Sequence, residues 1–428
     1  MVPFAKSLRV LSGNILVFAI TDMLGNFARS MVFAYASLYV LALGGDATRV
    51  GLVGFLGMLA GLVMLPVAGH ITNHSDRVRV IAVAGFLSSV FLVPMVLAPN
   101  WQVVAVASLL FGSVVFQFPA YASLIADSLS PADRGRGIGA MNTVSSSLAI
   151  VAPYIAGLIV QRYTANLGVR ILYAVMLVTY VCSSLIQLRF LHDGSSTPRE
   201  PLRLAALTRA LGQAYRAIPA LVRGMSPGMR ALAAVVLLSF LANGVTGAFW
   251  VVYATNQIGL SATQWGLILL LEAVVRLAAF LPGGLLVDRW GRRNALLAAL
   301  ALASVTIPLF VVVQGFAAIL LVRAAIAVTS GLAVPACMAL MADLIPRSLR
   351  GQMMAAIGQG GIFIGMAGGV GGPALGYLFI PPVMIASLAG GYLYSLRPSY
   401  PWLFALVSTL LALIVTVVFV REPGKAEV

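Results

Sequence analysis

Five ionisable side chains lie inside long apolar runs of this 428-residue chain: Asp22, Arg29, Glu272, Arg276 and Arg323. An ionised group at bilayer depth costs several kcal/mol unless it is paired or hydrated. A carboxylate in such a place can bind and release a proton, and a guanidinium group can neutralise it or attract an anion. These five residues are therefore the first candidates for any chemistry of the chain that involves a proton or an anion.

The spacing of these residues leaves several pairings open. Glu272 and Arg276 are one helical turn apart, so they either neutralise each other as a structural pair or take part in the chemistry. Asp22 and Arg29 are about two turns apart and would pair poorly with each other alone. Arg323 has no acidic neighbour in sequence, so it either pairs with Asp22 or Glu272 across the bundle or presents positive charge to a ligand.

Uncharged polar and aromatic side chains in the apolar runs can line the path of a solute. Each of them alone is more typical of a hydrogen bond between packed helices than of a ligand contact. The candidates for lining a cavity are Asn26, Gln117, Asn142, Asn243, Trp250, Tyr253 and Gln359.

Membrane helices must position these residues. Hydrophobic residues make up 61% of the chain and charged residues only 9%, with a mean hydropathy of +1.01, so too few polar groups remain to cover a water-facing surface. Apolar runs of about 20 residues, the length that spans a bilayer, recur roughly twelve times, without the alternation of barrel strands. We expect an all-α integral membrane protein with twelve transmembrane helices.

The basic residues indicate how the chain is oriented. The formal net charge of +15 would suit a nucleic-acid partner in a soluble protein, but here lysine and arginine cluster in alternate loops. The positive-inside rule then places both termini in the cytoplasm, beneath the cell (plasma) membrane, and argues against nucleic-acid binding. A basic connector at residues 192–228 is expected on the same side, with an amphipathic segment on the surface of the lipid bilayer.

The chain repeats itself at half its length. Five residues of the first half recur 215 residues later: Gly44, Ala47, Thr48, Gly51 and Leu52 as Gly259, Ala262, Thr263, Gly266 and Leu267. The repeat predicts two pseudo-symmetric six-helix bundles, residues 1–191 and 229–428, on either side of the 192–228 connector. A solute site between two such halves, which rock about it, is the arrangement expected from this symmetry.

Charged residues also recur at the ends of equivalent apolar runs. Together with one glycine, Gly284, they are expected to form a gating network; its charged members are Arg77, Asp127, Arg134, Asp288, Arg289, Arg292, Arg293, Asp343 and Arg350. Ion pairs between them can form in one conformation and separate in another, which supplies the differential contacts of a two-state protein. The alternative interpretation is that these arginines merely hold the orientation of the helices.

The segment from Gly284 to Arg293 resembles the signature loop of the major facilitator superfamily, G-x-x-x-D-R-x-G-R-R, at every defined position. Asp127 with Arg134, and Asp343 with Arg350, are similar to the acid-x6-arginine elements of that family. The loop of the first half departs from the pattern, since Asn73 stands where the family has an acid. The resemblance covers nearly the whole chain and implies alternating access, driven by an ion gradient and acting on a small organic solute.

Cofactor chemistry is not indicated. Cys182 and Cys337 lie inside apolar runs and suggest packing rather than a disulfide. His70, His74 and His192 show no metal-ligand spacing, and the chain has no P-loop. We expect no metal, no cofactor and no enzymatic activity.

The sequence therefore favours a monomeric secondary active transporter that moves a small-molecule solute together with protons. The alternatives are an uncoupled facilitator or organic-anion exchanger, and a non-transporting receptor on the same fold, against which the gating elements argue. Asp22 or Glu272 is the expected titrating group, and Asp22 is favoured because Glu272 has Arg276 one turn away. The sequence leaves open whether the eleventh helix, expected from the apolar run 353–380, is extended or broken near Pro381.

Overall fold

The computed structural model describes residues 11–194, 204–345, 353, 356–358, 361–368 and 376–422, and in these ranges its regular secondary structure is helical. The N half comprises α2 (Gly13–Phe33), α3 (Ala36–Ala42), α4 (Ala47–His74), α5 (Arg77–Leu97), α6 (Trp101–Gly112), η1 (Ser113–Gln117), α7 (Phe118–Asp127), α8 (Arg134–Ser147), η2 (Leu148–Ile150) and α9 (Ala152–Phe190). The connector holds α10 (Leu204–Gly224). The C half comprises α11 (Pro227–Thr246), α12 (Trp250–Asn256), α13 (Ala262–Trp290), α14 (Arg292–Leu309), α15 (Phe316–Leu344), α17 (Ile380–Leu396) and α18 (Tyr400–Phe419).

These helices make twelve membrane spans. Nine stretches within the described ranges are long and apolar enough to cross a bilayer. One of them, Arg134–Phe190, contains both the fifth and the sixth span, because α9 turns at Thr164, whose φ of 67° is incompatible with a right-handed helix. The ninth span is α14, and α17 belongs to the eleventh. The predicted twelve-helix, two-bundle architecture is confirmed.

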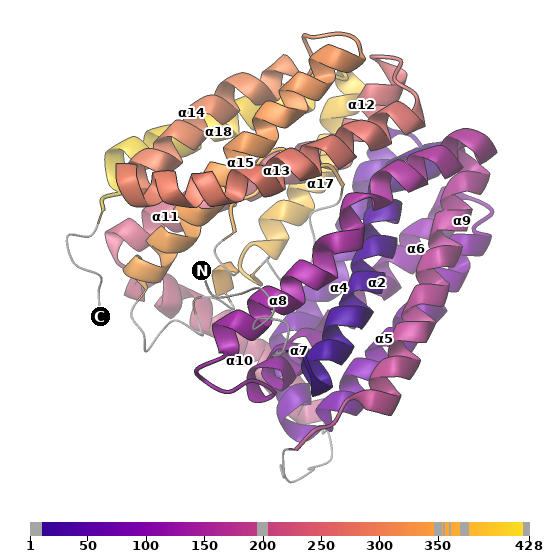
Figure 1. Ribbon diagram of the computed structural model, residues 1–428, viewed down its shortest axis with the longest axis vertical. Coiled ribbons are helices and arrows are strands. Elements are labelled where there is room, and N and C mark those ends of the chain that lie inside the picture. The colour runs from indigo at the N-terminus through magenta and orange to yellow at the C-terminus, as the bar shows by residue number, and fades with distance from the viewer. Residues whose placement is uncertain are drawn as a thin grey trace.

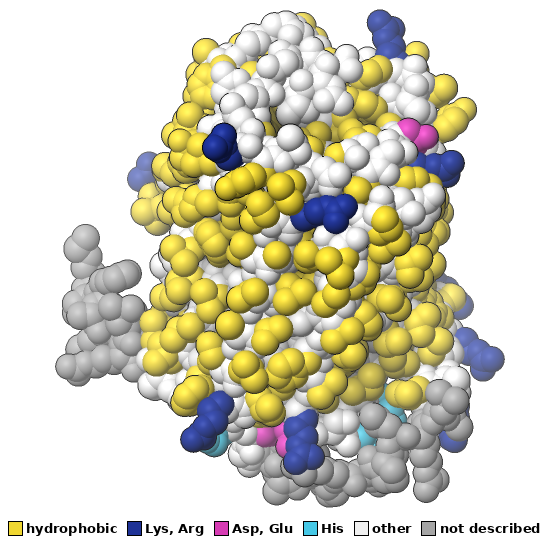
Figure 2. Space-filling model, turned by 90° about the vertical axis from the view of Figure 1, so that its right-hand side faces the viewer, with side chains coloured by type: hydrophobic (Ala, Val, Ile, Leu, Met, Phe, Trp, Pro, Cys, Tyr) yellow, Lys and Arg dark blue, Asp and Glu magenta, His cyan; other side chains and the backbone are white. Residues whose placement is uncertain are grey.

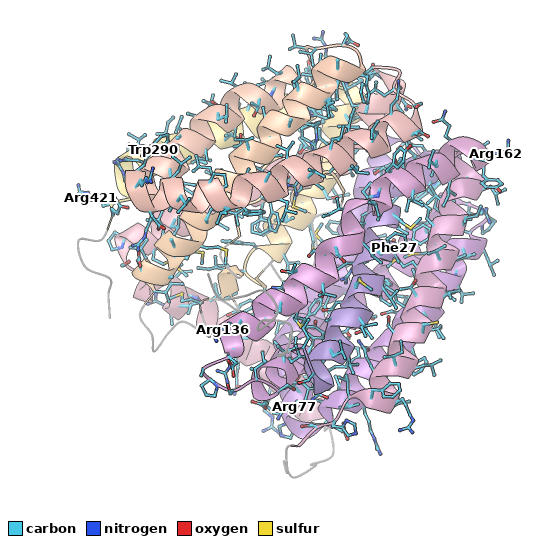
Figure 3. The ribbon with its side chains drawn as sticks, viewed as in Figure 1. Phe27, Arg77, Arg136, Arg162, Trp290 and Arg421 are labelled. Atoms are coloured by element: carbon cyan, nitrogen blue, oxygen red, sulfur yellow. The ribbon has the colours of Figure 1, made fainter. Side chains whose placement is uncertain are left out.

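The two halves lie side by side and diverge from one end of the molecule (Figure 1). We call this end the Tyr35 end, because contacts between the halves gather around that residue. Arg77 and Arg136 lie at the far end of the N half, and Trp290 and Arg421 at the far end of the C half (Figure 3). This second end is the signature-loop end. A band of hydrophobic side chains crosses the outer surface, with lysine and arginine toward its two ends (Figure 2), as expected for a surface that meets lipid.

Local signals in the sequence explain where the helices begin. Asp46, Asp76, Asn100 and Ser226 each accept a hydrogen bond from the backbone N–H three residues on, at the starts of α4, α5, α6 and α11. Ser261 does the same for α13, in a capping box completed by the side chain of Gln264. These caps satisfy N–H groups that the first helical turn leaves unpaired.

Glycines lie where the two halves touch, among them Gly51 and Gly266 of the repeated motif. A Cβ on Gly51 of α4 would come within 2.5 Å of the Ser387 carbonyl oxygen of α17, and one on Gly391 within 2.7 Å of the Ala47 carbonyl oxygen. At the other seam, a Cβ on Gly157 of α9 would lie 2.6 Å from the Ala262 carbonyl oxygen of α13. Backbones this close tolerate no side chain, so glycine at these positions allows the halves to meet.

Tyr35 joins three helices at this end. Its side chain is fully buried, and its hydroxyl lies 3.0 Å from the Pro153 carbonyl oxygen of α9 and 2.9 Å from the Ala262 carbonyl oxygen of α13. Two further hydrogen bonds cross between the halves, from the Thr263 N–H to Gln161 and from the Ser387 hydroxyl to the Gly51 carbonyl. The Tyr35 end is therefore closed by hydrogen bonds as well as by packing.

The eleventh span is broken rather than extended. The apolar run 353–380 was expected to supply its helix, but residues 361–368 are not helical, and the helix α17 starts only at Ile380. Pro381 and Pro382 occupy the first turn of α17, where a missing N–H costs nothing, and the glycines before them have low helix propensity. The sequence left open whether the eleventh helix is extended or broken. The glycines and the two prolines together explain why it is broken.

The connector helix α10 packs against the N half at a proline. Pro66 has no N–H, so the carbonyl of Leu62, four residues earlier in α4, loses its helical partner. The hydroxyl of Tyr215 donates to this carbonyl at 2.7 Å, and burial raises the pKa of Tyr215 above its ordinary value. The Tyr215 ring also contacts Tyr377 in a T-shaped pair at 6.3 Å, so α10 touches both halves.

Removal of the Tyr35 hydroxyl should loosen the Tyr35 end. Tyr35→Phe leaves two carbonyl groups without this donor, and a loss of about 1 kcal/mol would shift a two-state equilibrium about fivefold. We expect longer distances between spin labels at Arg162 and Gln257, measured by pulsed electron resonance. Tyr39→Phe is the matched control, since the buried Tyr39 hydroxyl donates to Met95 within the N half. Equal distances in wild type and Tyr35→Phe would contradict a role in closure.

Candidate functional site

Glu272 lies between two arginines in the core of the C half. Its side chain is 1% exposed, and its Oε2 atom is 2.7 Å from Nε and 2.5 Å from Nη2 of Arg323, which comes from α15. Its Oε1 atom pairs with Nη2 of Arg276, one turn further along α13. Both pairings considered from the sequence therefore occur together, and we call these three residues the Glu272 cluster.

Arg323 is held on every side. Its side chain is fully buried, and besides the two contacts with Glu272 its Nη1 donates to the Gly365 carbonyl at 2.7 Å. The guanidinium carbon also lies 4.5 Å from the ring centre of Trp250 and 5.7 Å from that of Trp265. Aromatic faces stabilise a desolvated cation. Arg323 is thus a structural member of the cluster: its charge is paired with Glu272, and Nε and Nη1 donate hydrogen bonds, while Nη2 makes the ion-pair contact without a hydrogen bond among the described residues.

Arg276 is held far less tightly. It reaches Glu272 through Nη2, its Nε atom is buried without a hydrogen-bond partner among the described residues, and its side chain is 30% exposed. A guanidinium group has five N–H donors. Most of the binding capacity of Arg276 is therefore unused.

The broken eleventh span is anchored to the same core. Asn243 of α11 donates to the Phe363 carbonyl and accepts a hydrogen bond from the Met366 N–H at 2.9 Å. The Ser330 hydroxyl lies 3.2 Å from the Ile364 carbonyl oxygen. Non-helical backbone at membrane depth needs such partners, because neither lipid nor a helix satisfies its polar groups. Asn243 therefore hydrogen-bonds to the backbone of a neighbouring segment. This is the packing role that the sequence offered as the alternative to ligand contact.

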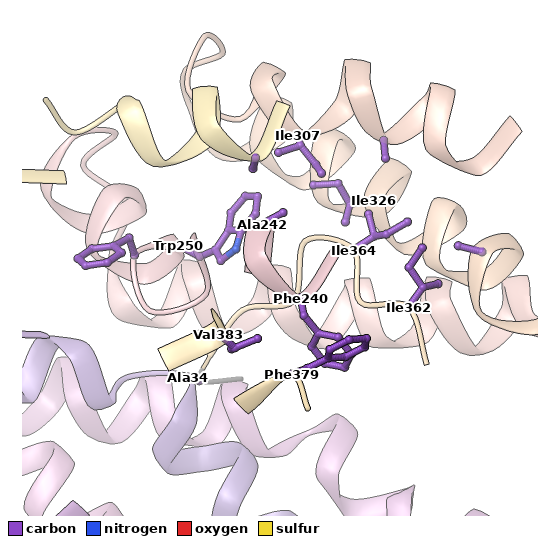
Figure 4. Close-up of a cluster of buried hydrophobic side chains, with 14 of the residues drawn as sticks. Ala34, Phe240, Ala242, Trp250, Ile307, Ile326, Ile362, Ile364, Phe379 and Val383 are labelled. Atoms are coloured by element: carbon purple, nitrogen blue, oxygen red, sulfur yellow. The ribbon is translucent and has the colours of Figure 1, made fainter. Parts of the chain in front are cut away.

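Trp250 and Tyr253 belong to an aromatic cluster of the C half. Trp250 is fully buried and lies 4.5 Å from Phe310 and 5.4 Å from Trp402, measured between ring centres, while Tyr253 lies 4.8 Å from Trp402. Trp250 and Asn243 border an enclosed space of about 10 Å³, near the size of one water molecule. Figure 4 shows Trp250 beside the segment that carries Ile362 and Ile364.

The N half holds Asp22 in a different way. The Tyr121 hydroxyl, from α7, donates to Oδ2 of Asp22, and Asp22 forms no ion pair with any residue of the described ranges. Arg29 donates instead to the Asn26 side chain at 2.6 Å, and Asn26 donates to the Ser145 carbonyl of α8 at 3.2 Å. Asp22 and Arg29 are near enough to interact electrostatically. The carboxylate therefore has a neutral hydrogen-bond donor and no direct ion pair among the described residues, with the charge of Arg29 nearby.

The remaining candidates for a solute path are spread out. Gln117 ends η1, a 3₁₀ turn that interrupts the fourth span, and Asn142 is exposed on α8. Gln359 lies outside the described residues. Their proposed role in lining a cavity stays a prediction.

A family model of the Major Facilitator Superfamily matches residues 18–226 and 232–428 of this chain, which is nearly its whole length. The chain belongs to the major facilitator superfamily. It is therefore a multi-pass membrane transporter, as the signature loop suggested. A comparison with curated proteins finds no match.

Solved structures of superfamily members share the fold. The chain superposes on a mutant of the nucleoside transporter NupG with a TM-score of 0.69 at 12% identity, covering 95% of this chain and all of the other. It also superposes on a bacterial homologue of the human lysosomal transporter Spinster in its inward-facing, occupied form, with a TM-score of 0.65 at 14% identity over 96% and 98% of the two chains. At such identities the likeness concerns the fold alone.

Residues expected to form the gating network make equivalent ion pairs in the two halves. Arg77 pairs with Asp127 at 2.6 Å, and Arg292, its counterpart 215 residues later, pairs with Asp343. Both pairs join helices of one half rather than crossing between halves, and Arg134 donates to the Ala126 carbonyl of the same half at 3.1 Å. This arrangement fits the divergence of the halves at the signature-loop end.

The rest of the signature loop packs on the last span or stays exposed. Arg293 donates to the carbonyls of Val417 and Val420 at 2.7 Å each, and the Arg292 N–H donates to Glu422. Asp288 and Arg289 are exposed, and a Cβ added to Gly284 would meet nothing within 4 Å. The list of gating candidates is completed by Arg350, which lies outside the described residues.

Three residues of this site were missed from the sequence. Tyr121 supports Asp22, Trp265 flanks Arg323, and Gly365 presents a carbonyl to the same arginine. A tyrosine or tryptophan in an apolar run is an ordinary packing residue by composition. Its partner across the bundle becomes visible only once the helices are placed.

Loss of the Glu272 charge should destabilise the C half. Glu272→Gln would leave Arg323 buried without its anion, which typically costs about 3–5 kcal/mol. We expect a clearly lower melting temperature of the purified protein in detergent. Asp22→Asn is the control, since it removes no ion pair and keeps an oxygen for Tyr121, so its change should stay within about 1 kcal/mol. Equal melting temperatures for wild type and Glu272→Gln would disprove the structural role.

Proposed function

We propose that this chain is a secondary active transporter, which moves a small organic solute across the plasma membrane by alternating access and is coupled to protons. The observation that carries the coupling is the state of Asp22. Two of the five charged span residues are carboxylates. Within the described ranges Glu272 forms ion pairs with two arginines, whereas Asp22 forms none and accepts a hydrogen bond from Tyr121. A carboxylate held by a neutral donor can take up a proton without breaking a direct ion pair.

Alternating access is supported by the way the halves touch. The contacts at the Tyr35 end cross between the halves, while the ion pairs at the signature-loop end stay within them. In the opposite state we propose that Asp288, Arg289 and Arg350 meet charges of the other half, as the gating network. The units that move are residues 1–191 and 229–428, which the connector 192–228 joins. One monomer contains both units and suffices for transport.

The orientation follows from the basic loops. We propose that the signature-loop end and both termini face the cytoplasm, because lysine and arginine concentrate there. The conformation described above would then be open toward the cytoplasm. An organic-anion exchanger is the second candidate function, favoured by Arg276, whose side chain is 30% exposed and contacts Glu272 through one nitrogen.

The coupling hypothesis predicts a specific defect in Asp22→Asn. Asparagine imitates the protonated acid permanently, so the protein should exchange solute across a membrane but fail to accumulate it under an imposed pH gradient. The measurement is uptake of a panel of solutes into liposomes that contain the purified protein, with and without the gradient. Tyr121→Phe keeps the carboxylate and should retain accumulation with a shifted pH dependence. Gradient-driven accumulation by Asp22→Asn would exclude Asp22 as the coupling site.

The orientation can be tested in intact cells. A single cysteine in place of Arg289, which is exposed at the signature-loop end, should resist a membrane-impermeant maleimide until the cells are permeabilised. A single cysteine in place of Arg162, at the opposite end, should react without permeabilisation (Figure 3). The reverse pattern would invert the proposed topology.

A further inference from the structure

The Glu272 cluster carries more positive charge than negative charge. One carboxylate faces the guanidinium groups of Arg276 and Arg323, so the three groups sum to one net positive charge. Asp22 and Arg29, the other two charged span residues, cancel each other in the sum. A net charge inside the bundle is unfavourable unless a counter-ion or water compensates it. The cluster is therefore electrostatically incomplete.

The uncompensated charge resides on Arg276. Arg323 is fully buried, holds Glu272 through two nitrogens and the Gly365 carbonyl through the third, and lies against two tryptophan rings. Arg276 shares the same carboxylate through one nitrogen and is 30% exposed. A ligand can therefore reach Arg276 without dismantling the Glu272–Arg323 pair.

The position of Arg276 on α13 points to the space between the halves. Gly266, on the same helix, marks the direction of the N half, since a Cβ there would run into Pro153 and Tyr154 of α9. An α-helix turns by about 100° per residue, so Arg276 lies about 80° around the helix axis from Gly266. It lies on the same side of Gly266 as the buried Glu272. Val274, Leu281 and Leu285, exposed by 46%, 77% and 55%, lie on the other side of the Gly266 direction, as expected for a lipid-facing surface.

The depth of Arg276 excludes a lipid headgroup as its partner. It is the middle residue of α13, which has 29 residues, so about 21 Å of helix separate it from either end. Headgroups lie at the membrane surface, beyond the hydrocarbon core. An anion that reaches Arg276 must come along the path between the two halves.

We propose that Arg276 binds the anionic group of the transported solute, so that the substrate is an organic anion with a carboxylate or a similar oxyanion. This inference rests on the proposed transport function and names the class of its substrate. The planar guanidinium can hold an oxyanion with two parallel N–H bonds while Glu272 keeps its pair with Arg323. A cationic solute would meet uncompensated positive charge at the same place.

The test measures the charge preference at the site without requiring transport. Phe280, four residues after Arg276 and 40% exposed, is replaced by cysteine in a chain without Cys182 and Cys337. The rates of its reaction with anionic sulfonatoethyl and cationic trimethylammonioethyl methanethiosulfonate are compared, each divided by the rate with a free thiol. We expect the anionic reagent to be favoured about tenfold, as for a unit charge within one helical turn in a partly hydrated site.

Variants then assign the preference to Arg276. Arg276→Gln should abolish it, Arg276→Lys should retain it, and Arg421→Gln, at the far end of the C half (Figure 3), should leave it unchanged. If the protein with Arg276 in place reacts faster with the cationic reagent, the proposal is wrong. This measurement does not depend on whether Arg276→Gln folds. An unchanged ratio in Arg276→Gln overturns it as well. Neither result would affect the coupling role of Asp22, which is tested by accumulation.

Discussion

The C half is organised around a single carboxylate that two guanidinium groups share. Burial of Arg323 is affordable only because Glu272 and two tryptophan rings surround it. Arg323 in turn supplies a donor to the Gly365 carbonyl, and Asn243 and Ser330 hold the neighbouring carbonyls of the same segment. The broken eleventh span can exist at membrane depth because these donors replace the helical hydrogen bonds that it lacks. Without the buried arginine, that stretch of backbone would lose a partner that lipid cannot supply.

A second constraint, backbone contact between the halves, explains the internal repeat. The repeated motif places Ala47 and Ala262 in the first turns of α4 and α13, with Gly51 and Gly266 one turn later. Gly391 approaches the Ala47 carbonyl and Gly157 approaches the Ala262 carbonyl, so the two seams have the same construction. The motif thus encodes a surface at which helices touch without intervening side chains. A contact of this kind depends on close backbone packing rather than on interlocking side chains, which would suit halves that separate during the proposed transport cycle.

The sequence predicted most of the architecture, and its failures have physical reasons. Apolar runs, the repeat and the signature loop depend on composition and order along the chain, and each led to the right fold. The eleventh span was misplaced because apolar composition alone does not distinguish a helix from a glycine-rich segment held by side chains of other helices. The partner of Arg323 stayed open for the same reason, since Glu272 is 51 residues away in sequence. Tyr35 and Tyr121 were overlooked because their roles lie in single hydroxyl groups that meet distant elements.

The two halves divide the charge chemistry, and the sum of charges explains why a proton and an anion would travel together. With Asp22 ionised and the site empty, the five span residues carry one net positive charge. A monoanion on Arg276 together with a proton on Asp22 leaves that sum unchanged, so the loaded and the empty protein face a similar electrostatic cost on changing conformation.

A proton alone would raise the sum to two positive charges, which disfavours leakage of protons. An anion alone would reduce it to zero, so the loaded form would move more easily than the empty one and the protein would exchange anions rather than accumulate them. Under the two proposals together, coupled transport and anion exchange would be two modes of the same protein, and the protonation of Asp22 would select between them.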